Sequence, residues 1–283
     1  MKKPNTRIVS ASLITETVKR LFIQANYNLP LDARDRIREC RRIEPWPPAQ
    51  EALDAIIVNF ETAFDVMPIC QDTGMACVFL EIGERVYIDG GVADAVDEGV
   101  RLACKEGFLR ASVVSDPLER KNSGDNTPAL LYIDMAPGGT VRVTVAPKGF
   151  GSENMSRIAM LAPSDGVAGV VAFVIKTIEE AGANPCPPIV AGVGIGGSFD
   201  KAALIAKKAL LRPLGQRNRN PIYAALEERL LEKINALGIG PAGLGGQTTA
   251  LAVNIETMPT HIAGLPVAVN ISCHAIRHAA AVL

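Results

Sequence analysis

The sequence predicts a mixed α/β (α+β) fold, with a helical N-terminal portion over about residues 1–65 and a compact mixed-sheet body behind it. Before position 65, apolar residues recur near the 3.6-residue period of a helix. After it, β-branched runs bounded by glycine-rich turns alternate with helical segments. The length allows one large domain or two modest ones. Because no shift in composition marks a boundary, we expect residues 1–283 to form a single domain.

Three helices are expected in the N-terminal portion. The first opens at Ser10, where the periodic apolar residues begin. The second follows Pro30, and the proline-rich segment 45–48 separates it from the third. In chain order, these helices cover residues 10–22, 31–43 and 49–64.

The body is expected to contain both strands and helices. Val141, Val143 and Val145 alternate with polar residues, which is the period of a strand with one buried face. Alternate residues from Leu265 to Cys273 share one face of the last strand we expect. In chain order, strands are expected over 75–82, 85–88, 141–145, 189–195 and 265–273, and helices over 91–107, 163–181, 198–211 and 221–237.

Composition excludes several classes of protein. Hydrophobic residues make up 48% and charged residues 21%, which excludes global disorder. The net charge of −1 and the 5% aromatic content argue against nucleic acid or an anionic membrane as partner. No apolar run approaches the ~18 residues of a membrane span. No apolar stretch follows the basic N-terminus either, so we expect a cytoplasmic protein.

Six cysteines fall into two groups by position. None forms a C-x-x-C pair, which excludes zinc ribbons, thioredoxin motifs and bacterial-type ferredoxin runs. Three of them, Cys40, Cys77 and Cys104, lie inside expected helices or strands and are interpreted as structural. The other three, Cys70, Cys186 and Cys273, lie at the ends of elements, where a thiolate can point into a cleft.

Three thiolates from distant loops can hold a [4Fe–4S] cluster and leave one iron without a protein ligand. Such an open iron acts as a Lewis acid, like the open position of a catalytic zinc site. The alternative interpretation is that these cysteines are also small buried hydrophobes. Spacing alone does not decide between the two.

Glycine-rich turns raise a second question. Residues 192–197 satisfy the G-x-G-x-x-G pattern after an apolar strand, which is the context of a dinucleotide-binding turn. That fold also needs an acidic residue roughly 20 positions on, and none occurs between Lys201 and Leu226. We therefore favour a tight strand-to-helix turn that packs close to a neighbour over nicotinamide binding.

Five separate blocks together resemble the class I iron–sulfur hydro-lyases, the family of oxygen-sensitive fumarate hydratase and L-tartrate dehydratase. The blocks are residues 70–74 (CQDTG), 122–128 (NSGDNTP), 149–154 (GFGSEN), 186–188 (CPP) and 272–275 (SCHA). They occur in order over nearly the whole chain. The resemblance implies a [4Fe–4S] cluster, held in a cleft by Cys70, Cys186 and Cys273, with one iron open to substrate.

The same resemblance assigns roles around the cluster. Arg110 and His261 match the family's substrate-binding arginine and histidine, and Gly151 would offer a backbone N–H to a carboxylate. Gln71 would hydrogen-bond the substrate, and Asp72 would bind it and support the acid–base group.

Two positions depart from the family's pattern. Phe150 stands where we expect a glycine, and His274 follows Cys273 where relatives commonly have tryptophan. His274 and His278 receive no role.

The resemblance also implies a partner and a substrate class. The chain resembles an α subunit, so we expect a separate β subunit to supply the main acid–base group, in an α₂β₂ assembly. The substrate would be a C4 dicarboxylate: fumarate hydrated to (S)-malate first, L-tartrate converted to oxaloacetate second, with mesaconate also open. The alternative from a different class is a redox sensor that holds a cluster without turnover.

Overall fold

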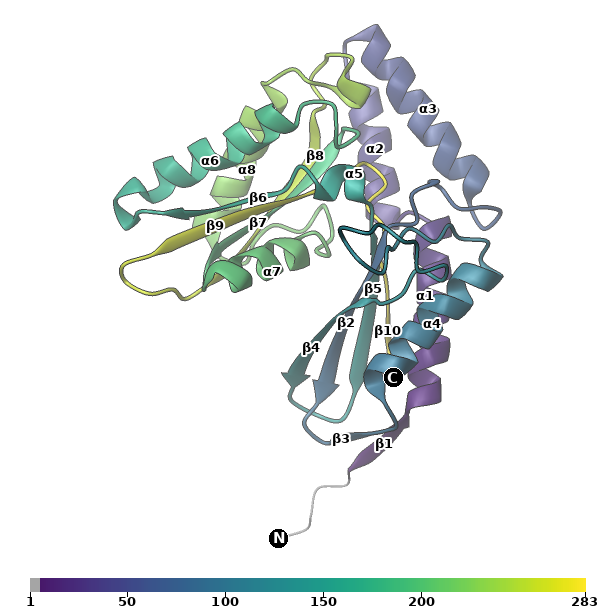
Figure 1. The fold of residues 1–283 in the computed structure, drawn as a ribbon. Coiled ribbons are helices and arrows are strands. Elements are labelled where there is room, and N and C mark those ends of the chain that lie inside the picture. The colour runs from purple at the N-terminus through teal and green to yellow at the C-terminus, as the bar shows by residue number, and fades with distance from the viewer. Residues whose placement is uncertain (1–5) are drawn as a thin grey trace. The chain divides into compact units, whose positions relative to one another are not determined.

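A computed structural model describes residues 6–283 and confirms a mixed α/β fold (Figure 1). Residues 1–5 of the expected helical portion lie outside the described residues. The chain divides into two compact units. The first unit comprises Thr62–Phe150, Arg277–Leu283 and the described part of Met1–Pro30, and the second comprises Leu31–Glu61 and Gly151–Ile276.

The first unit is a four-stranded sheet with helices on one face. Its elements are β1 (Arg7–Ser10), α1 (Ala11–Tyr27), β2 (Met75–Gly83), β3 (Val86–Asp89), α4 (Val92–Glu106), β4 (Leu130–Ala136), β5 (Val141–Lys148) and β10 (Ala279–Val282). The sheet order is β10-β5-β2-β4, with β2 parallel to β4 and antiparallel to β5, and β10 antiparallel to β5. β1 and β3 form a separate parallel pair.

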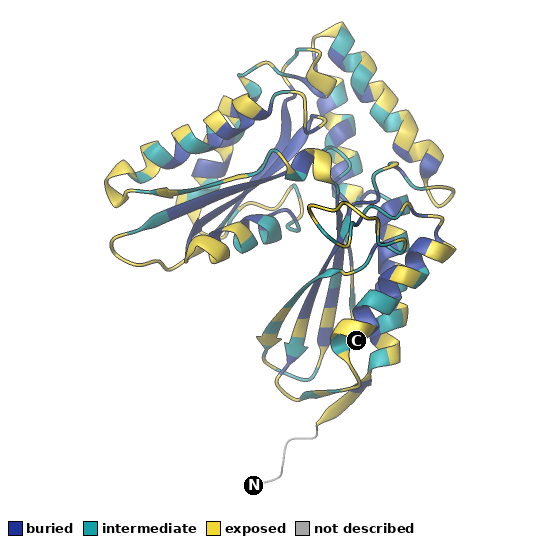
Figure 2. Cartoon of the chain, in the orientation of Figure 1, coloured by how far each residue is buried: buried dark blue, intermediate teal, exposed yellow. Residues whose placement is uncertain are grey.

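Helices α1 and α4 supply the core of the first unit. Val18 and Phe22 of α1 pack with Val96 and Val100 of α4 against the valine face of β5. Helix α1 begins where Ser10 caps it, because the Ser10 hydroxyl accepts a hydrogen bond from the backbone N of Leu13. Figure 2 shows that burial in this sheet is greatest along the central strands β2 and β5, and that the outward faces of the helices are exposed.

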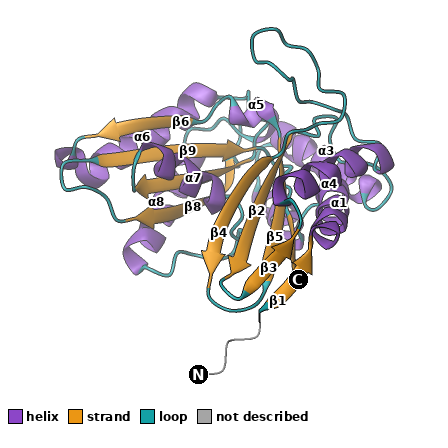
Figure 3. Cartoon of the chain, turned by 60° about the horizontal axis from the view of Figure 1, so that its bottom comes forward, coloured by secondary structure: helices purple, strands orange, loops and turns teal. Residues whose placement is uncertain are grey.

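The second unit is a four-stranded sheet with helices on both faces (Figure 3). Its elements are α2 (Leu31–Ile43), α3 (Pro47–Ala63, whose last two residues fall in the first unit), β6 (Arg157–Leu161), α6 (Gly166–Ala181), β7 (Ile189–Gly196), α7 (Phe199–Ala209), α8 (Pro221–Asn235), β8 (Ala250–Met258) and β9 (Leu265–Ser272). The sheet order is β6-β9-β7-β8, with β7 parallel to β8 and antiparallel to β9. The short helix α5 (Phe150–Glu153) lies where the chain passes between the units.

The glycines of β7 explain how α7 packs so closely on this sheet. A Cβ at Gly192 would lie 2.2 Å from the carbonyl oxygen of Ala206, and one at Gly194 would lie 2.2 Å from that of Ala202. The glycine pattern therefore serves close packing between a helix and a strand, as the sequence favoured, with two of its glycines inside the strand itself.

Several predicted boundaries need correction. The helix expected from 163 begins as a 3₁₀ turn over Pro163–Asp165, and the α-helix starts at Gly166. The strand ending near Cys273 is not the last, because β10 follows it. The sequence also missed β1, β4, β6 and β8. Within the described residues, no helix has both the length and the apolar character of a membrane span.

Candidate functional site

The Asp72 side chain fixes the turn that precedes β2. Its Oδ1 accepts a hydrogen bond from the backbone N of Gly74, and its Oδ2 accepts one from the backbone N of Phe150, each at 3.0 Å. The Asp72 backbone N–H donates to Cys70 Sγ at an N···S distance of 3.4 Å. The turn leaves Cys70 half-buried and Gln71 exposed, so both side chains can meet a ligand.

Glycine is required at position 74. Its φ is +73°, and a Cβ would lie 2.5 Å from the carbonyl oxygen of Lys148. The Asn126 side chain then ties a second loop to this turn. Its Nδ2 donates to the carbonyl of Gly74 at 3.0 Å, and its Oδ1 accepts from the backbone N of Ser112 at 2.8 Å. Asn126 is fully buried, so these bonds specify the loop geometry.

Two of the five sequence blocks and the start of a third therefore meet in the first unit. The Asp125 carboxylate stiffens the second block. Burial alone would raise the pKa of Asp125, but hydrogen bonds from Thr127 and Arg101 outweigh it and lower that pKa to about 2. Arg110 lies on the neighbouring stretch, where its exposed side chain forms no hydrogen bond or ion pair with any described residue. It is therefore available to an anionic ligand.

Cys186 and Cys273 lie on adjacent segments of the second unit. Cys186 is exposed and has a φ of +54°, which is uncommon for a residue with a side chain. Its carbonyl oxygen accepts a hydrogen bond from the backbone N of His274 at 3.4 Å and lies 3.0 Å from His274 Nδ1. β7 and β9 are antiparallel, with Val190 opposite Ser272, so both cysteines lie at the same end of this sheet.

A glycine-rich loop supports the Cys186 segment. The backbone N of Ala242 donates to the carbonyl of Pro187 at 2.8 Å. Glu44, which is only 2% exposed, accepts from the backbone N of Thr248 at 2.9 Å and from its hydroxyl at 2.8 Å. Trp46 donates from Nε1 to the carbonyl of Leu244 at 3.0 Å. The loop is thus held from both ends.

The six cysteines fall into the same two groups by burial as by their positions in the sequence. Cys40, Cys77 and Cys104 are 2%, 1% and 8% exposed. Burial raises the pKa of the Cys40 thiol, and it raises that of Cys104 to about 11, so both stay protonated. None of the six, all within residues 6–283, is in a disulfide. The three more accessible thiols are the three assigned to the cluster.

The donor set suits an iron–sulfur cluster by its chemistry, since clusters are held by cysteine thiolates. Cys70 belongs to the first unit, and Cys186 and Cys273 belong to the second. Among the described residues, no three His, Cys, Asp or Glu side chains are grouped closely enough to hold a metal ion.

His261 lies far from the two cysteines of its own unit. It is exposed in the loop between β8 and β9, where Thr260 Oγ1 donates to the carbonyl of Gly197 at 2.9 Å. Gly197 follows the end of β7, whereas Cys186 precedes its start. Eight residues of strand span roughly 25 Å. The sheet therefore keeps His261 and Cys186 apart.

Gly151 is exposed in α5, and a Cβ there would meet only the carbonyl oxygen of Asn184, at 3.9 Å. Arg277 was missed by sequence reasoning. It is 4% exposed and donates to the backbone carbonyl of Asp72 at 2.8 Å. The signal available in the sequence was one arginine, the only residue with a permanent charge, in the C-terminal segment 265–283.

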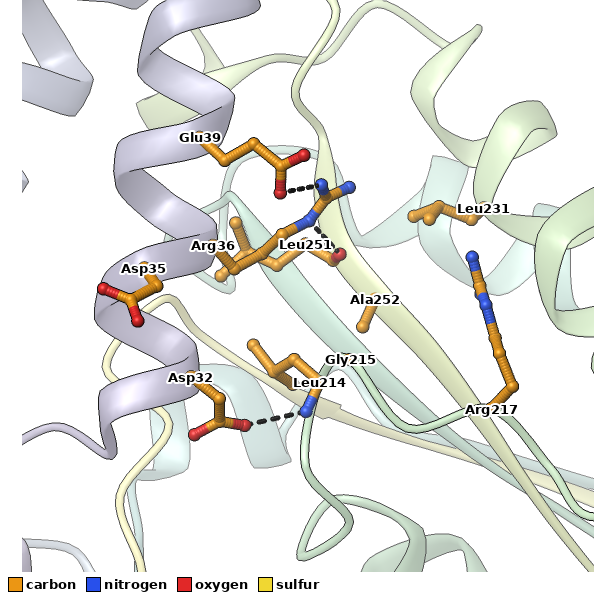
Figure 4. Close-up of a pocket in the computed structure, with 10 residues that line it drawn as sticks. All are labelled: Asp32, Asp35, Arg36, Glu39, Leu214, Gly215, Arg217, Leu231, Leu251 and Ala252. Atoms are coloured by element: carbon orange, nitrogen blue, oxygen red, sulfur yellow. Dashed lines mark hydrogen bonds and ion pairs between the residues drawn. The ribbon is translucent and has the colours of Figure 1, made fainter.

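A cavity of about 340 Å³ beside α2 contains none of the predicted site residues (Figure 4). Its charged groups mostly bond within the protein: Arg36 pairs with Glu39 at 2.7 Å, and Asp32 accepts from the backbone N of Leu214 at 2.8 Å. It is therefore not the predicted site.

Comparison with known proteins identifies relatives over nearly the full chain. The family described as fumarate hydratase (Fumerase) matches residues 15–282. A Methanocaldococcus jannaschii protein named "Putative L(+)-tartrate dehydratase subunit alpha" is 44% identical over 274 residues, which cover 94% of this chain and 96% of that protein. The L(+)-tartrate dehydratase subunit alpha of Escherichia coli (strain K12) is 32% identical over 281 residues, covering 98% of this chain and 93% of that protein.

Proposed function

The chain belongs to the fumarate hydratase family of hydro-lyases, and from that premise we propose that it is the α subunit of a [4Fe–4S]-dependent enzyme that hydrates fumarate to (S)-malate reversibly. The observation that carries this proposal is the family match over residues 15–282, which includes all five sequence blocks.

Cys70, Cys186 and Cys273 are the proposed cluster ligands. When bound, the cluster would supply a Lewis-acidic iron that polarises the C–O bond of the substrate. The burial contrast supports these three over Cys40 and Cys104, whose raised thiol pKa values disfavour the thiolate.

The chain's own residues would bind and orient the substrate. Arg110 suits a carboxylate because its planar fork donates two parallel hydrogen bonds. Gln71 would hydrogen-bond the substrate from the turn beside Cys70, and the Gly151 backbone N–H would donate to a carboxylate. Asp72 would contribute by holding the turn rigid and supporting the group that moves the proton. That proton-transferring group would come from a separate β subunit.

His261 would contact substrate in a second copy of the chain. The length of β7 supports this part of the proposal, because roughly 25 Å is beyond the reach of a histidine side chain bound within the same unit. An assembly with two α chains, such as the expected α₂β₂, would supply the second copy.

L-tartrate is the second candidate substrate, and the relatives favour it. The Methanocaldococcus jannaschii and Escherichia coli proteins are both named for L(+)-tartrate dehydratase. The product would be oxaloacetate. An added hydroxyl is a small change for a pocket that already binds two carboxylates, so the α chain residues above serve either reaction.

Turnover assays on the anaerobically reconstituted α–β complex test the proposal, with fumarate, L-tartrate and mesaconate supplied separately. Rapid hydration of fumarate supports the first candidate, and selective dehydration of L-tartrate replaces it with the second. A complex that holds a cluster yet turns over none of the three contradicts the enzyme proposal and favours redox sensing.

A cytoplasmic location is part of the proposal, because scattered thiols outside disulfides suit a reducing compartment.

A further inference from the structure

Arg277 is a buried cation without a carboxylate partner. It is 4% exposed, and among the described residues it forms no ion pair. Its Nε is buried and has no hydrogen-bond partner. Arg212 is half-buried and offers a contrast, because it pairs with both Glu227 and Glu256. A buried charge left uncompensated in this way is costly, so its position calls for a reason.

The Arg277 guanidinium connects helix α1 to the turn that contains Cys70. Arg277 Nη1 donates to Asn26 Oδ1 at 2.8 Å, and Asn26 is fully buried on α1. The Asn26 carbonyl also accepts from the backbone N of Ile69 at 2.9 Å. Arg277 Nη2 donates to the carbonyl of Asp72 at 2.8 Å, and the N–H of that same residue donates to Cys70 Sγ.

The Asp72 carboxylate is not hydrogen-bonded to the guanidinium. Its two oxygens are used by the backbone N–H groups of Gly74 and Phe150, and it forms no ion pair with Arg277. The Arg277 guanidinium therefore binds the main chain two residues after a thiol assigned to the cluster, and no carboxylate pairs with it directly. A thiolate-ligated cluster is an anion, and hydrogen bonds to its sulfurs raise its reduction potential.

We propose that Arg277 is a positioning residue for Cys70. It holds the main chain at Asp72 through the Asp72 carbonyl, so that the N–H of the same residue stays aimed at the Cys70 sulfur, and its positive charge balances the anionic cluster. The inference rests on the proposed function for the anion and on the geometry above for the positioning.

The test compares Arg277→Gln, which removes the charge, with Arg277→Lys, which keeps the charge but loses the two-pronged geometry. Amide hydrogen exchange over residues 69–75 is measured first in cluster-free protein. The midpoint potential of the cluster and the rate of iron loss to a chelator are then measured after anaerobic reconstitution. Arg212→Gln is the matched control, because it also removes an arginine side chain with little exposure but lies in the other unit, paired to carboxylates.

In both variants we expect about tenfold faster exchange at the 69–75 amides, the effect of losing one buried hydrogen bond to a charged donor. Arg277→Gln should also lower the midpoint potential and speed iron loss, while Arg277→Lys keeps a potential near that of the unsubstituted chain. Arg212→Gln should change neither the potential nor the exchange of these amides.

Unchanged exchange in both variants would overturn the positioning role, and an unchanged potential in Arg277→Gln would overturn the charge role. If Arg277→Gln does not fold, Arg277→Lys decides the positioning role, and unchanged exchange at the 69–75 amides in it would overturn the proposal. If the unsubstituted chain binds no cluster, the proposed function fails, whereas the exchange comparison still tests the positioning of Cys70.

Discussion

Burial and local geometry divide the cysteines into two groups of three, and this division has a chemical consequence. Cys40 and Cys104 are buried, and burial raises the pKa of each thiol. A ligand must be a thiolate, so these residues are poor candidates. Cys186 differs most, since it is exposed and held at a positive φ between two prolines.

Substitution of the cysteines tests this division. After anaerobic reconstitution, the proposed cluster should give the unsubstituted chain about four irons and a broad visible absorbance. Replacement of Cys70, Cys186 or Cys273 by serine should abolish both. Serine at Cys40 or Cys104 should leave both unchanged. Loss of the cluster from one of the buried positions would show that the ligand assignment is wrong, and equal loss from all would indicate general destabilisation.

Arg110 is the exposed cation best placed for a carboxylate. Arg110→Ala should weaken dicarboxylate protection of the cluster by roughly tenfold to a hundredfold, because one charge-assisted hydrogen bond is worth about 1.5–3 kcal/mol. Iron content and thermal unfolding should not change, because the side chain bonds to no described residue. Arg229→Ala on α8 is the exposed control. Unaltered protection in Arg110→Ala would place the substrate site elsewhere.

At the scale of elements, the close packing of α7 on the glycines of β7 predicts how a larger side chain there changes stability. Gly194→Ala would place a Cβ 2.2 Å from the Ala202 carbonyl oxygen, so α7 must move. Such overpacking costs about 1–3 kcal/mol, which chemical denaturation of the second unit should detect. Gly215→Ala is the control, because nothing lies within 4 Å of its added Cβ. Equal stability of the two variants would contradict the packing explanation.

The elements also show what the sequence predicts well and why it fails elsewhere. Helices with one apolar face, such as α2, are predicted to the residue because their periodicity is amphipathic. β8 was missed because its first six residues are all buried, so they show no alternation. β4 lies at the edge of its sheet and is mostly half-exposed on both faces, so its apolar and polar residues do not alternate clearly either. The alternation of apolar and polar residues therefore predicts neither a fully buried strand nor a half-exposed edge strand.

At the scale of the whole molecule, the candidate site depends on contacts that sequence order cannot supply. The family blocks supply the candidate residues, but only the fold shows that Asn126 joins two of those blocks in one unit. Only the fold shows that His274 links the segments of Cys186 and Cys273. His261 is the opposite case, because its motif fits the family while the length of β7 separates it from Cys186.

Complementation tests whether His261 acts in a second copy. A His261→Ala chain and a Cys186→Ser chain should each be inactive with the β subunit. Coexpressed, they should recover activity, because a mixed pair contains one site with intact cysteines from one copy and an intact histidine from the other. Random pairing predicts up to about a quarter of the unsubstituted activity. No recovery in demonstrably mixed dimers would contradict action in trans.

The last prediction concerns the β subunit, which the relatives' designation as subunit alpha implies. A site that excludes water strengthens each electrostatic contact to a dicarboxylate and protects an open iron from oxidation. Without its partner, the α chain lacks the proposed proton-transferring group. Reconstituted α alone should therefore bind a cluster but show negligible hydratase activity. Added β should restore turnover and slow the oxidative loss of iron. Full activity from α alone would refute a divided site and require a base within this chain, with Asp72 and His261 the first to substitute.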